Sequence, residues 1–214
     1  MISDSDFFCI ENLNYLPWIG NHYDGKLLVM GESHYGEDNP KRINEVNMPQ
    51  FTRVCAQEMG VEGFTWGKVK FYKNLWRIGQ KYKLDMTTND FWNKVVYCNL
   101  VQKAMLDSKS RPTLNDFENG ANVFCKILLK LKPKACLMAG LSSLNYVYRF
   151  SSENDFKVIE NITFGNVGRS KPRYLKLEHE SGYTVDLIFI QHPSKYFSYN
   201  AWGNFLLNQF PNLL

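Results

Sequence analysis

Several features of disulfide-bonded, zinc-binding and membrane proteins are missing from this sequence. Its five cysteines are scattered, and no two of them have the Cys-x-x-Cys spacing of a zinc ribbon. No apolar run approaches the roughly 20 residues that a membrane-spanning helix needs. The first residues, MISDSDFF, are acidic and lack the basic and apolar segments of a secretory signal. Together these absences argue against a disulfide scaffold and favour a protein of the reducing cytoplasm.

The length and composition are those of an ordinary globular protein. We expect the 214 residues to form a single domain, residues 1–214, with a sizeable core and an N-terminal leader over residues 1–25. Hydrophobic residues make up 44% of the chain and charged residues 21%. The net charge of +4 is compatible with a polyanionic partner without requiring one.

Four short apolar segments, each followed by glycine or polar residues, dominate the sequence. They cover residues 27–30, 95–99, 135–139 and 184–190, and segments with helical apolar spacing separate them. Strands that alternate with helices predict the α/β class. We expect a three-layer αβα sandwich with a central, mainly parallel four-stranded sheet. Ligands of such sheets bind beyond the carboxyl ends of the strands.

The helices between these strands are predicted from apolar spacing and capping residues. Thr113 and Asp116 resemble a capping box at the start of one helix, and Pro133 stops that helix. Two β-like runs, at 158–164 and 174–179, flank a basic loop at 168–173. The predicted helices cover residues 51–59, 71–82, 88–92, 113–131, a segment after Ser143, and a C-terminal segment around 202–210.

Three polar residues, Glu32, Asn99 and His192, follow predicted strands. Each has an ordinary interpretation alone: a solvated acid, an amide bonded to loop backbone, and a histidine in a turn that precedes a helix. Because parallel strands end along one edge of their sheet, we expect the three side chains to share that edge. A carboxylate there can orient a water, and an amide has the adjacent donor and acceptor that match the edge of a nucleobase.

Several motifs occur in an order known from one protein family. They are GESHYG after the first strand, VVYCN, RPTLNDFENGANVFCKILLKLKPKACLMAG, and QHPSKYFS after the fourth strand. Together they resemble the uracil-DNA glycosylase superfamily over roughly residues 27–198. The family's first motif has forms such as GQDPY and GEAPG, and its last motif is HPSP-L-S. The likeness is most specific in HPS and least faithful in the first motif.

The resemblance implies hydrolysis of an N-glycosidic bond and a role for each matching residue. Asn99 would hydrogen-bond an extruded base, His192 would donate to the base carbonyl oxygen, and Glu32 would place the attacking water. Ser194 would touch a backbone phosphate. Tyr196 would fill the gap that the flipped base leaves in the stack.

Further contacts with the base follow from the same resemblance. Phe64 or Trp66, in GFTWG, would stack on the base, and Tyr35 would exclude the thymine methyl group. Ser33 and His34, in the same loop as Glu32, are also expected to lie against the base. The cations expected to contact DNA phosphates are Lys195, Arg169, Lys171 and Arg173, whose ordinary role would be a solvated face.

The sequence departs from the family pattern in ways that bear on the reaction. Ser33 stands at the acid of GQDPY, whereas Glu32 matches the acid of GEAPG, and His34 replaces the proline that both forms share. Lys195 replaces the proline after HPS. The branch with GEAPG holds an iron–sulfur cluster on four cysteines, and no matching cysteine set occurs here. We therefore expect neither a metal nor another cofactor.

Three functions remain open at this point. The leading hypothesis is a monomeric DNA glycosylase that removes uracil or another altered base from single- or double-stranded DNA. The second is a non-catalytic module that uses the same pocket to bind a nucleobase or nucleic acid. The third is a hydrolase with Ser33 or Ser194 as nucleophile, although the G-x-S-x-G elbow is missing.

Overall fold

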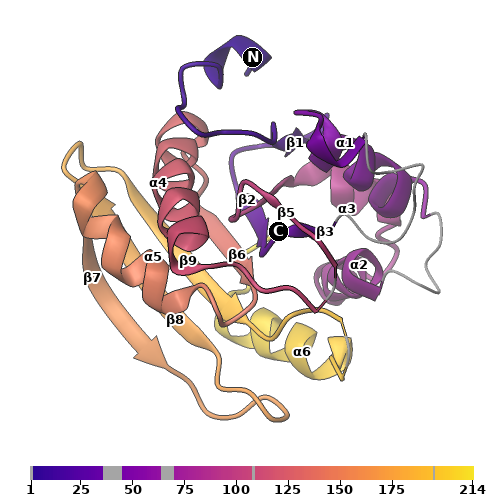
Figure 1. Cartoon of the computed structure of the whole chain (residues 1–214). Helices are drawn as coiled ribbons and strands as arrows, with labels where there is room; N and C mark the ends of the chain where they lie inside the picture. The colour runs from indigo at the N-terminus through magenta and orange to yellow at the C-terminus, as the bar shows by residue number, and fades with distance from the viewer. Residues whose placement is uncertain (1, 36–44, 64–69, 108, 195) are drawn as a thin grey trace.

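The computed structural model describes residues 2–35, 45–63, 70–107, 109–194 and 196–214 (Figure 1). In this part of the chain, seven strands form one mixed sheet in the order β1-β4-β2-β6-β9-β8-β7. Their bounds are β1 Trp18–Ile19, β2 Leu27–Gly31, β4 Val96–Asn99, β6 Ala135–Ala139, β7 Phe156–Thr163, β8 Arg173–His179 and β9 Thr184–Ile190.

The four predicted strands form the centre of this sheet. β4, β2, β6 and β9 lie side by side and run parallel, with Leu28 opposite Val96 and Cys136. The expected four-stranded sheet is nevertheless too small, because antiparallel strands extend it at both edges. β1 comes from the N-terminal leader, and the β-like runs around the basic loop pair as the β7–β8 hairpin, so the sheet is mixed rather than mainly parallel.

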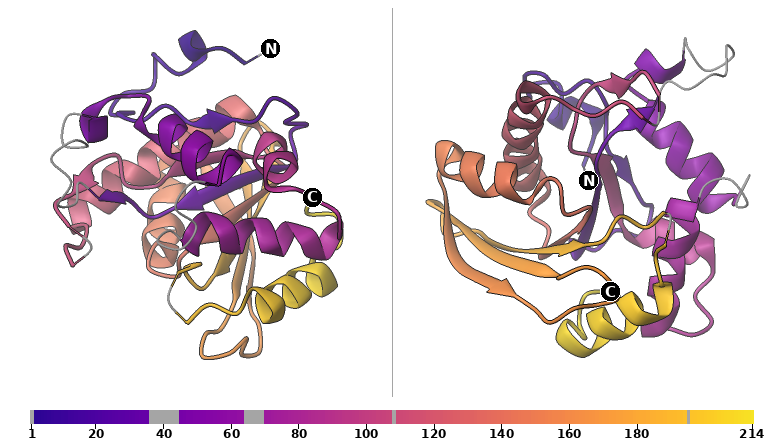
Figure 2. Two further views of the ribbon diagram at one scale, coloured as in Figure 1. Left: turned by 90° about the vertical axis from the view of Figure 1, so that its right-hand side faces the viewer. Right: turned by 60° about the horizontal axis from the view of Figure 1, so that its bottom comes forward.

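Helices cover both faces of the sheet and make three layers (Figures 1 and 2). Leu28 and Met30 of β2 pack into a core with α4 and α5, while Leu27 and Val29 pack on the opposite side. This alternation follows from the period-2 geometry of a strand. The helices are α4 (Leu114–Leu131) and α5 (Leu144–Ser151) on one face, and α1 (Phe51–Cys55), α2 (Lys70–Tyr82), α3 (Thr88–Lys94) and α6 (Tyr199–Gln209) on the other. No helix in the described part is long and apolar enough to cross a membrane.

The predicted capping box at the start of α4 is confirmed. The Thr113 side chain accepts from the Asp116 backbone N–H at 3.2 Å, and the Asp116 carboxylate accepts from the Thr113 N–H at 2.9 Å. The helix ends at Leu131, where Lys132 adopts a left-handed conformation with φ of 44° before Pro133. The box satisfies two of the four free N–H groups at the helix start, which fixes where α4 begins.

The N-terminal leader is bound closely to the rest of the fold. Arg53 of α1 donates to both carboxylate oxygens of Asp4, at 3.0 and 2.6 Å, and to the Pro17 carbonyl at 3.0 Å. Gly20 lies so close to the backbone of Asn93 that a side chain there would collide with it. The leader is therefore tied to the fold by these contacts and supplies the edge strand β1 at Trp18–Ile19.

A second, two-stranded sheet joins β3 (His34–Tyr35) to β5 (Ala104–Met105). His34 is 5% exposed, and its Nε2 shares a hydrogen bond of 2.7 Å with the Thr52 hydroxyl. Its ring lies edge-on between Tyr15 and Phe51, with both centroids at 4.9 Å. His34, which we expected to lie against a base, is instead buried, with its Nε2 bonded to Thr52 and its ring packed on Tyr15 and Phe51.

The burial of His34 makes stability depend on pH. Desolvation lowers the pKa of His34 to about 3, from 6.5, so the unfolded chain binds a proton at this residue below pH 6.5 that the folded chain does not. The free energy of unfolding should therefore fall by about 1.4 kcal/mol for each pH unit below 6.5 through this residue. Urea unfolding at several pH values over roughly 1.5 units below the ordinary histidine pKa measures that slope. His34→Gln, which keeps a partner for Thr52, should flatten it, and an unchanged slope would contradict the assignment.

Candidate functional site

The strand order changes direction at β2. From β2 the chain passes to β4 on one side, and after α4 it returns to β6 on the other side, so the switch point lies between β2 and β6. Crevices at such points are where open α/β sheets bind ligands. Glu32 directly follows β2, and Ser142 comes shortly after β6. The Ser142 hydroxyl donates to the Glu32 carboxylate, which holds this half-buried acid across the switch point.

Asn99 is the last residue of β4 and is only 2% exposed. Its Oδ1 accepts a hydrogen bond of 3.0 Å from the Tyr97 hydroxyl. Its Nδ2 is buried and has no hydrogen-bond partner among the described residues. Gly31, which pairs with Asn99 in register, makes room for this amide, since a side chain at Gly31 would collide with Asn99 Oδ1. An unsatisfied donor in a buried position is unusual and marks a place where a ligand acceptor would be stabilising.

His192 lies in the turn after β9, and α2 holds this turn in place. The Asn74 amide donates to the Pro193 carbonyl at 3.1 Å. The Phe71 ring lies against the imidazole, with centroids 5.3 Å apart. Nδ1 of His192 shares a hydrogen bond of 2.9 Å with the Ser194 hydroxyl. The remaining ring nitrogen, Nε2, makes no hydrogen bond to another described residue and is the atom that can face a ligand.

Two charges act on His192. Desolvation lowers its pKa below the usual 6.5, the Glu32 carboxylate acts to raise it, and Arg111 acts to lower it further. The side chain is exposed on one side, yet the protein on its other sides removes enough water to favour the neutral ring. His192 is therefore neutral at pH 7, and both Glu32 and the loop that carries Arg111 lie near enough to influence it.

A chain of rings connects Asn99 to His192. Tyr97, which donates to Asn99, lies 5.9 Å from Phe71 between ring centroids, and Phe71 in turn contacts His192. The structure thus brings Glu32, Asn99 and His192 to one edge of the sheet, as their positions after strands predict. Ser194 joins them through its bond to His192.

The basic hairpin loop lies at the same edge. Arg173, the first residue of β8, pairs with Phe189 near the end of β9. The Ser170 hydroxyl donates to Gln191 at 3.3 Å, and the Gln191 amide donates to the Tyr196 carbonyl at 3.3 Å. These bonds tie the 164–172 loop to the 191–196 loop.

The cationic and aromatic side chains predicted for DNA contact differ in exposure. Arg169 and Lys171 are exposed, and Tyr196 is 78% exposed with a left-handed φ of 61°. Arg173 is half-buried and donates to Asn161 at 3.2 Å, so its guanidinium is partly used within the hairpin. Arg169 and Lys171 are the two cations of the loop whose side chains are exposed at this edge.

The other predicted residues divide into two groups. Tyr35 is half-buried against the core on the α4 side, and Ser33 is half-buried with a hydroxyl that has no partner in the described part. Phe64, Trp66 and Lys195 lie outside the described residues.

Four residues of this edge are not predicted from the sequence: Ser142, Arg111, Phe71 and Tyr97. Ser142 follows a predicted strand, so the rule that selects Glu32 and Asn99 could have found it. Phe71 and Tyr97 look like ordinary core aromatics in the sequence. Arg111 lies in the quoted RPTLNDF motif, but nothing in the motif alone directs its charge toward His192.

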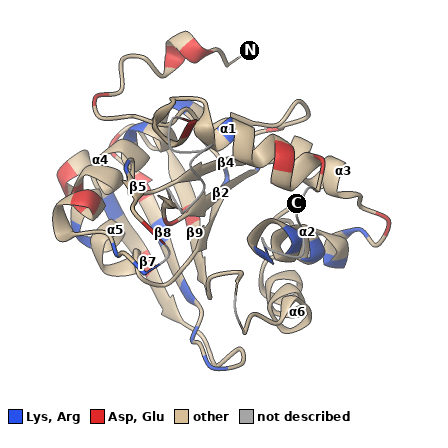
Figure 3. Cartoon of the chain, turned by 45° about the vertical axis from the view of Figure 1, so that its right-hand side comes forward, with Lys and Arg blue, Asp and Glu red and all other residues tan. Residues whose placement is uncertain are grey.

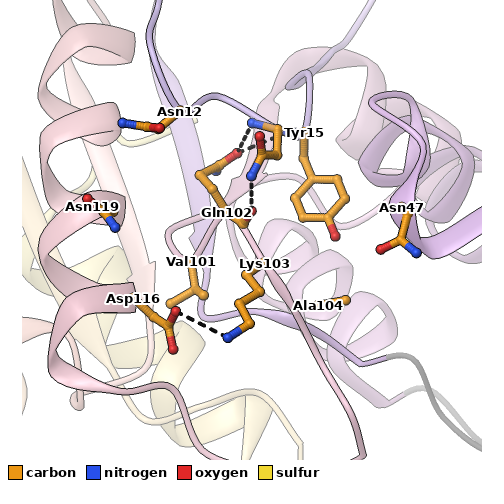
Figure 4. Close-up of a pocket in the computed structure, with 10 residues that line it drawn as sticks. Asn12, Tyr15, Asn47, Val101, Gln102, Lys103, Ala104, Asp116 and Asn119 are labelled. Atoms are coloured by element: carbon orange, nitrogen blue, oxygen red, sulfur yellow. Dashed lines mark hydrogen bonds and ion pairs between the residues drawn. The ribbon is translucent and has the colours of Figure 1, made fainter.

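A separate polar pocket of about 460 Å³ lies beside the start of α4 (Figure 4). Gln102, which lines it, also bonds to Asn99: its Oε1 accepts from the N–H groups of Asn14 and Tyr15, and its Nε2 donates to the Asn99 carbonyl at 2.8 Å. The lining residues are Asn12, Asn14, Tyr15, Asn47, Val101, Gln102, Lys103, Ala104, Asp116 and Asn119. None of the predicted site residues lines this pocket.

The contact between Ser194 and His192 also bears on the hydrolase hypothesis. A serine nucleophile needs a histidine base that is oriented by a third group, usually an acid. No carboxylate is hydrogen-bonded to His192 among the described residues. Ser33 is likewise without a hydrogen-bonded base in the described part. The arrangement therefore favours ligand binding and hydrogen-bond donation by His192 over acyl transfer.

No family model matches the chain, and no curated protein is similar to it in sequence.

The opposing effects of Glu32 and Arg111 on His192 predict how its pKa responds to substitution. Glu32→Gln removes the carboxylate that raises the pKa, so the pKa should fall further below 6.5; Arg111→Gln should raise it. The measurement is an NMR titration of the His192 imidazole. Lys26→Gln, a change at the opposite end of β2, is the control and should leave the midpoint unchanged. If neither variant moved the midpoint, the three groups would not share a site.

Proposed function

We propose that this edge binds an extruded base of DNA and that the protein is a glycosylase acting on uracil or another altered base. The observation that carries the proposal is the buried, unpartnered Nδ2 of Asn99 at the end of a central strand, with Glu32 and His192 at the same edge. A base edge supplies the acceptor that this donor lacks. Enzymes that act on a base take it out of the stack and read it in an active-site pocket.

The chemistry needs a donor for the leaving base and an acceptor for the water. As the bond between C1′ and the base nitrogen breaks, its electron pair moves into the base and the carbonyl oxygen becomes more negative. His192 can donate from Nε2 to that oxygen when the Ser194 hydroxyl donates to Nδ1, a tautomer that suits the neutral ring.

Glu32 provides the other half of the reaction. Its carboxylate, held by Ser142, orients a water toward C1′ and takes a proton from it as the new C–O bond forms. The products are a sugar with a 1′-hydroxyl and the base, which takes up the released proton. No step of the reaction written here requires a metal or a cofactor.

The surroundings of the site suit a negatively charged partner. Arg169 and Lys171 are exposed on the hairpin loop. The exposed Tyr196 would fill the gap that a flipped base leaves in the stack. Helix α2, whose residues Phe71 and Asn74 contact the HPS turn, carries cations at intervals of three or four residues: Lys70, Lys73, Arg77 and Lys81. Neither α2 nor the adjacent α6 contains an acidic residue, as the blue of α2 in Figure 3 illustrates.

The second candidate, a binding module without turnover, is favoured by the neutral state of His192. A neutral imidazole stabilises developing negative charge less than an imidazolium does, because charge-assisted hydrogen bonds are stronger. The loss of the motif proline at His34 points the same way. A glycosylase breaks the glycosidic bond and a binding module leaves it intact, so an assay for bond cleavage distinguishes the two candidates.

That assay measures abasic sites in uracil-containing single- and double-stranded DNA. Glu32→Gln and His192→Asn should each lower the rate by about 100-fold or more, because each removes a group that acts on the reacting atoms. Glu153→Gln and His22→Asn change the same residue types at exposed positions outside the site and should leave the rate unchanged.

Full activity of either site variant would eliminate the assigned role. Absence of cleavage on uracil, hypoxanthine and alkylated bases, together with retained binding, would favour the binding module instead. Absence of both cleavage and base-dependent binding would eliminate the proposal.

The hairpin cations predict a steep salt dependence of DNA binding. Replacing both Arg169 and Lys171 with glutamine should weaken binding at low salt, and the slope of log K against log salt should flatten by about 0.7 per lost contact on single strands. Fluorescence anisotropy between low and moderate salt measures this slope. In the matched control, glutamine replaces Lys134 and Lys157, which are exposed at the amino ends of the parallel strands, opposite the candidate site. This variant should keep the original slope. Equal slopes in both double variants would refute the assignment.

A further inference from the structure

We infer that Tyr97 is a positioning residue that fixes the amide of Asn99 in one orientation, so that the site accepts a base edge with a carbonyl oxygen and rejects an amino group. The inference rests on the proposed function and adds a determinant of specificity to it. Tyr97 would not touch the base. It would act through the hydrogen bond that its hydroxyl makes to Asn99 Oδ1.

Two buried hydroxyls set the direction of this hydrogen bond. The Tyr72 hydroxyl donates to the Tyr97 hydroxyl at 3.4 Å, and the Tyr97 hydroxyl donates to Asn99 Oδ1 at 3.0 Å. Because the Tyr97 oxygen already accepts from Tyr72, its own proton is directed to Asn99. Tyr97 is 3% exposed, and desolvation raises its pKa well above the usual 10, so this proton is retained at any physiological pH.

The backbone of β2 supports the same orientation. Oδ1 of Asn99 lies against Gly31, at the place where a side chain on Gly31 would collide with it. The Tyr97 hydroxyl lies near the same point, at 3.3 Å from that side-chain position. With Oδ1 held between Gly31 and Tyr97, the Nδ2 group is left as the part of the amide that has no partner in the described structure.

A hydrogen-bond donor fixed in a buried site distinguishes bases by the group that they present to it. A carbonyl oxygen satisfies Nδ2, whereas an amino group would place two donors against each other and leave both unsatisfied. Uracil has a carbonyl oxygen where cytosine has an amino group, and hypoxanthine and adenine differ in the same way. A buried mismatch of this kind corresponds to roughly 10- to 100-fold in affinity. If the Tyr97 hydroxyl is removed, the amide can turn and offer Oδ1, and the discrimination should shrink.

The test compares binding of two single-stranded oligonucleotides that differ only in one base, uracil or cytosine. Glu32→Gln is used as the background so that the uracil substrate stays intact during the measurement. Fluorescence anisotropy gives the ratio of the two dissociation constants for this background, for added Tyr97→Phe, and for added Tyr72→Phe. Tyr183→Phe is the matched control, because it removes the hydroxyl of a half-buried tyrosine that bonds to the Pro133 carbonyl at 2.8 Å, away from the site.

The expected result is a preference for uracil in the background that falls by about tenfold in Tyr97→Phe and by less in Tyr72→Phe, with no change in Tyr183→Phe. Thermal unfolding of each variant accounts for any general loss of structure. Tyr72→Phe provides a second reading of the same hydroxyl chain should Tyr97→Phe be unstable.

Two results would overturn the inference, and they are distinguishable. An unchanged ratio in Tyr97→Phe, with base-dependent binding that is lost in Asn99→Ala, would remove the role of Tyr97 and leave the proposed function standing. Equal binding of both oligonucleotides by the background and by Asn99→Ala would remove base recognition itself, and the proposed function with it.

Discussion

The candidate site depends on the close approach of β2 and β4 at Gly31. A glycine at this position leaves space for the amide of Asn99, and the two residues pair in register at the carboxyl ends of their strands. Beyond the strands, the backbone continues the pairing: the Leu100 N–H donates to the Gly31 carbonyl at 3.0 Å and the Val101 N–H to the Glu32 carbonyl at 2.9 Å. Burial of Asn99 and the direction of the chain at Glu32 are thus consequences of one packing constraint.

The electrostatics of the edge follow from a balance around His192. Desolvation and Arg111 favour the neutral ring, and Glu32 opposes them. A neutral ring can donate one hydrogen bond without forming an ion pair with Glu32, so the carboxylate stays available to Ser142 and to a water. The same balance limits how strongly His192 can stabilise a leaving anion, which is why binding and turnover remain separate experimental questions.

Local patterns predict the four parallel strands, the Thr113 capping box and the shared edge of Glu32, Asn99 and His192, because burial, capping and strand ends leave marks in the sequence. The β7–β8 hairpin is recognised only as two β-like runs, since its place in the sheet depends on the pairing of Arg173 with Phe189. Tyr97 and Phe71 are hidden for a related reason. Their roles arise from the residues beside them in space. In the sequence, an aromatic residue in an apolar run looks the same whether it only fills the core or also orients a residue of the site.

His34 stands where the glycosylase motif that GESHYG resembles has a proline, and the fold gives this histidine a structural role. A proline restricts a loop through its own ring, which fixes φ. Here the loop after Glu32 is restricted by tertiary contacts instead: His34 lies between two aromatic rings, and its Nε2 is bonded to Thr52 of α1. Ser142 holds the other end of the loop through the Glu32 carboxylate. The loop after β2 therefore keeps Glu32 at the switch point through a buried histidine and the bond from Ser142.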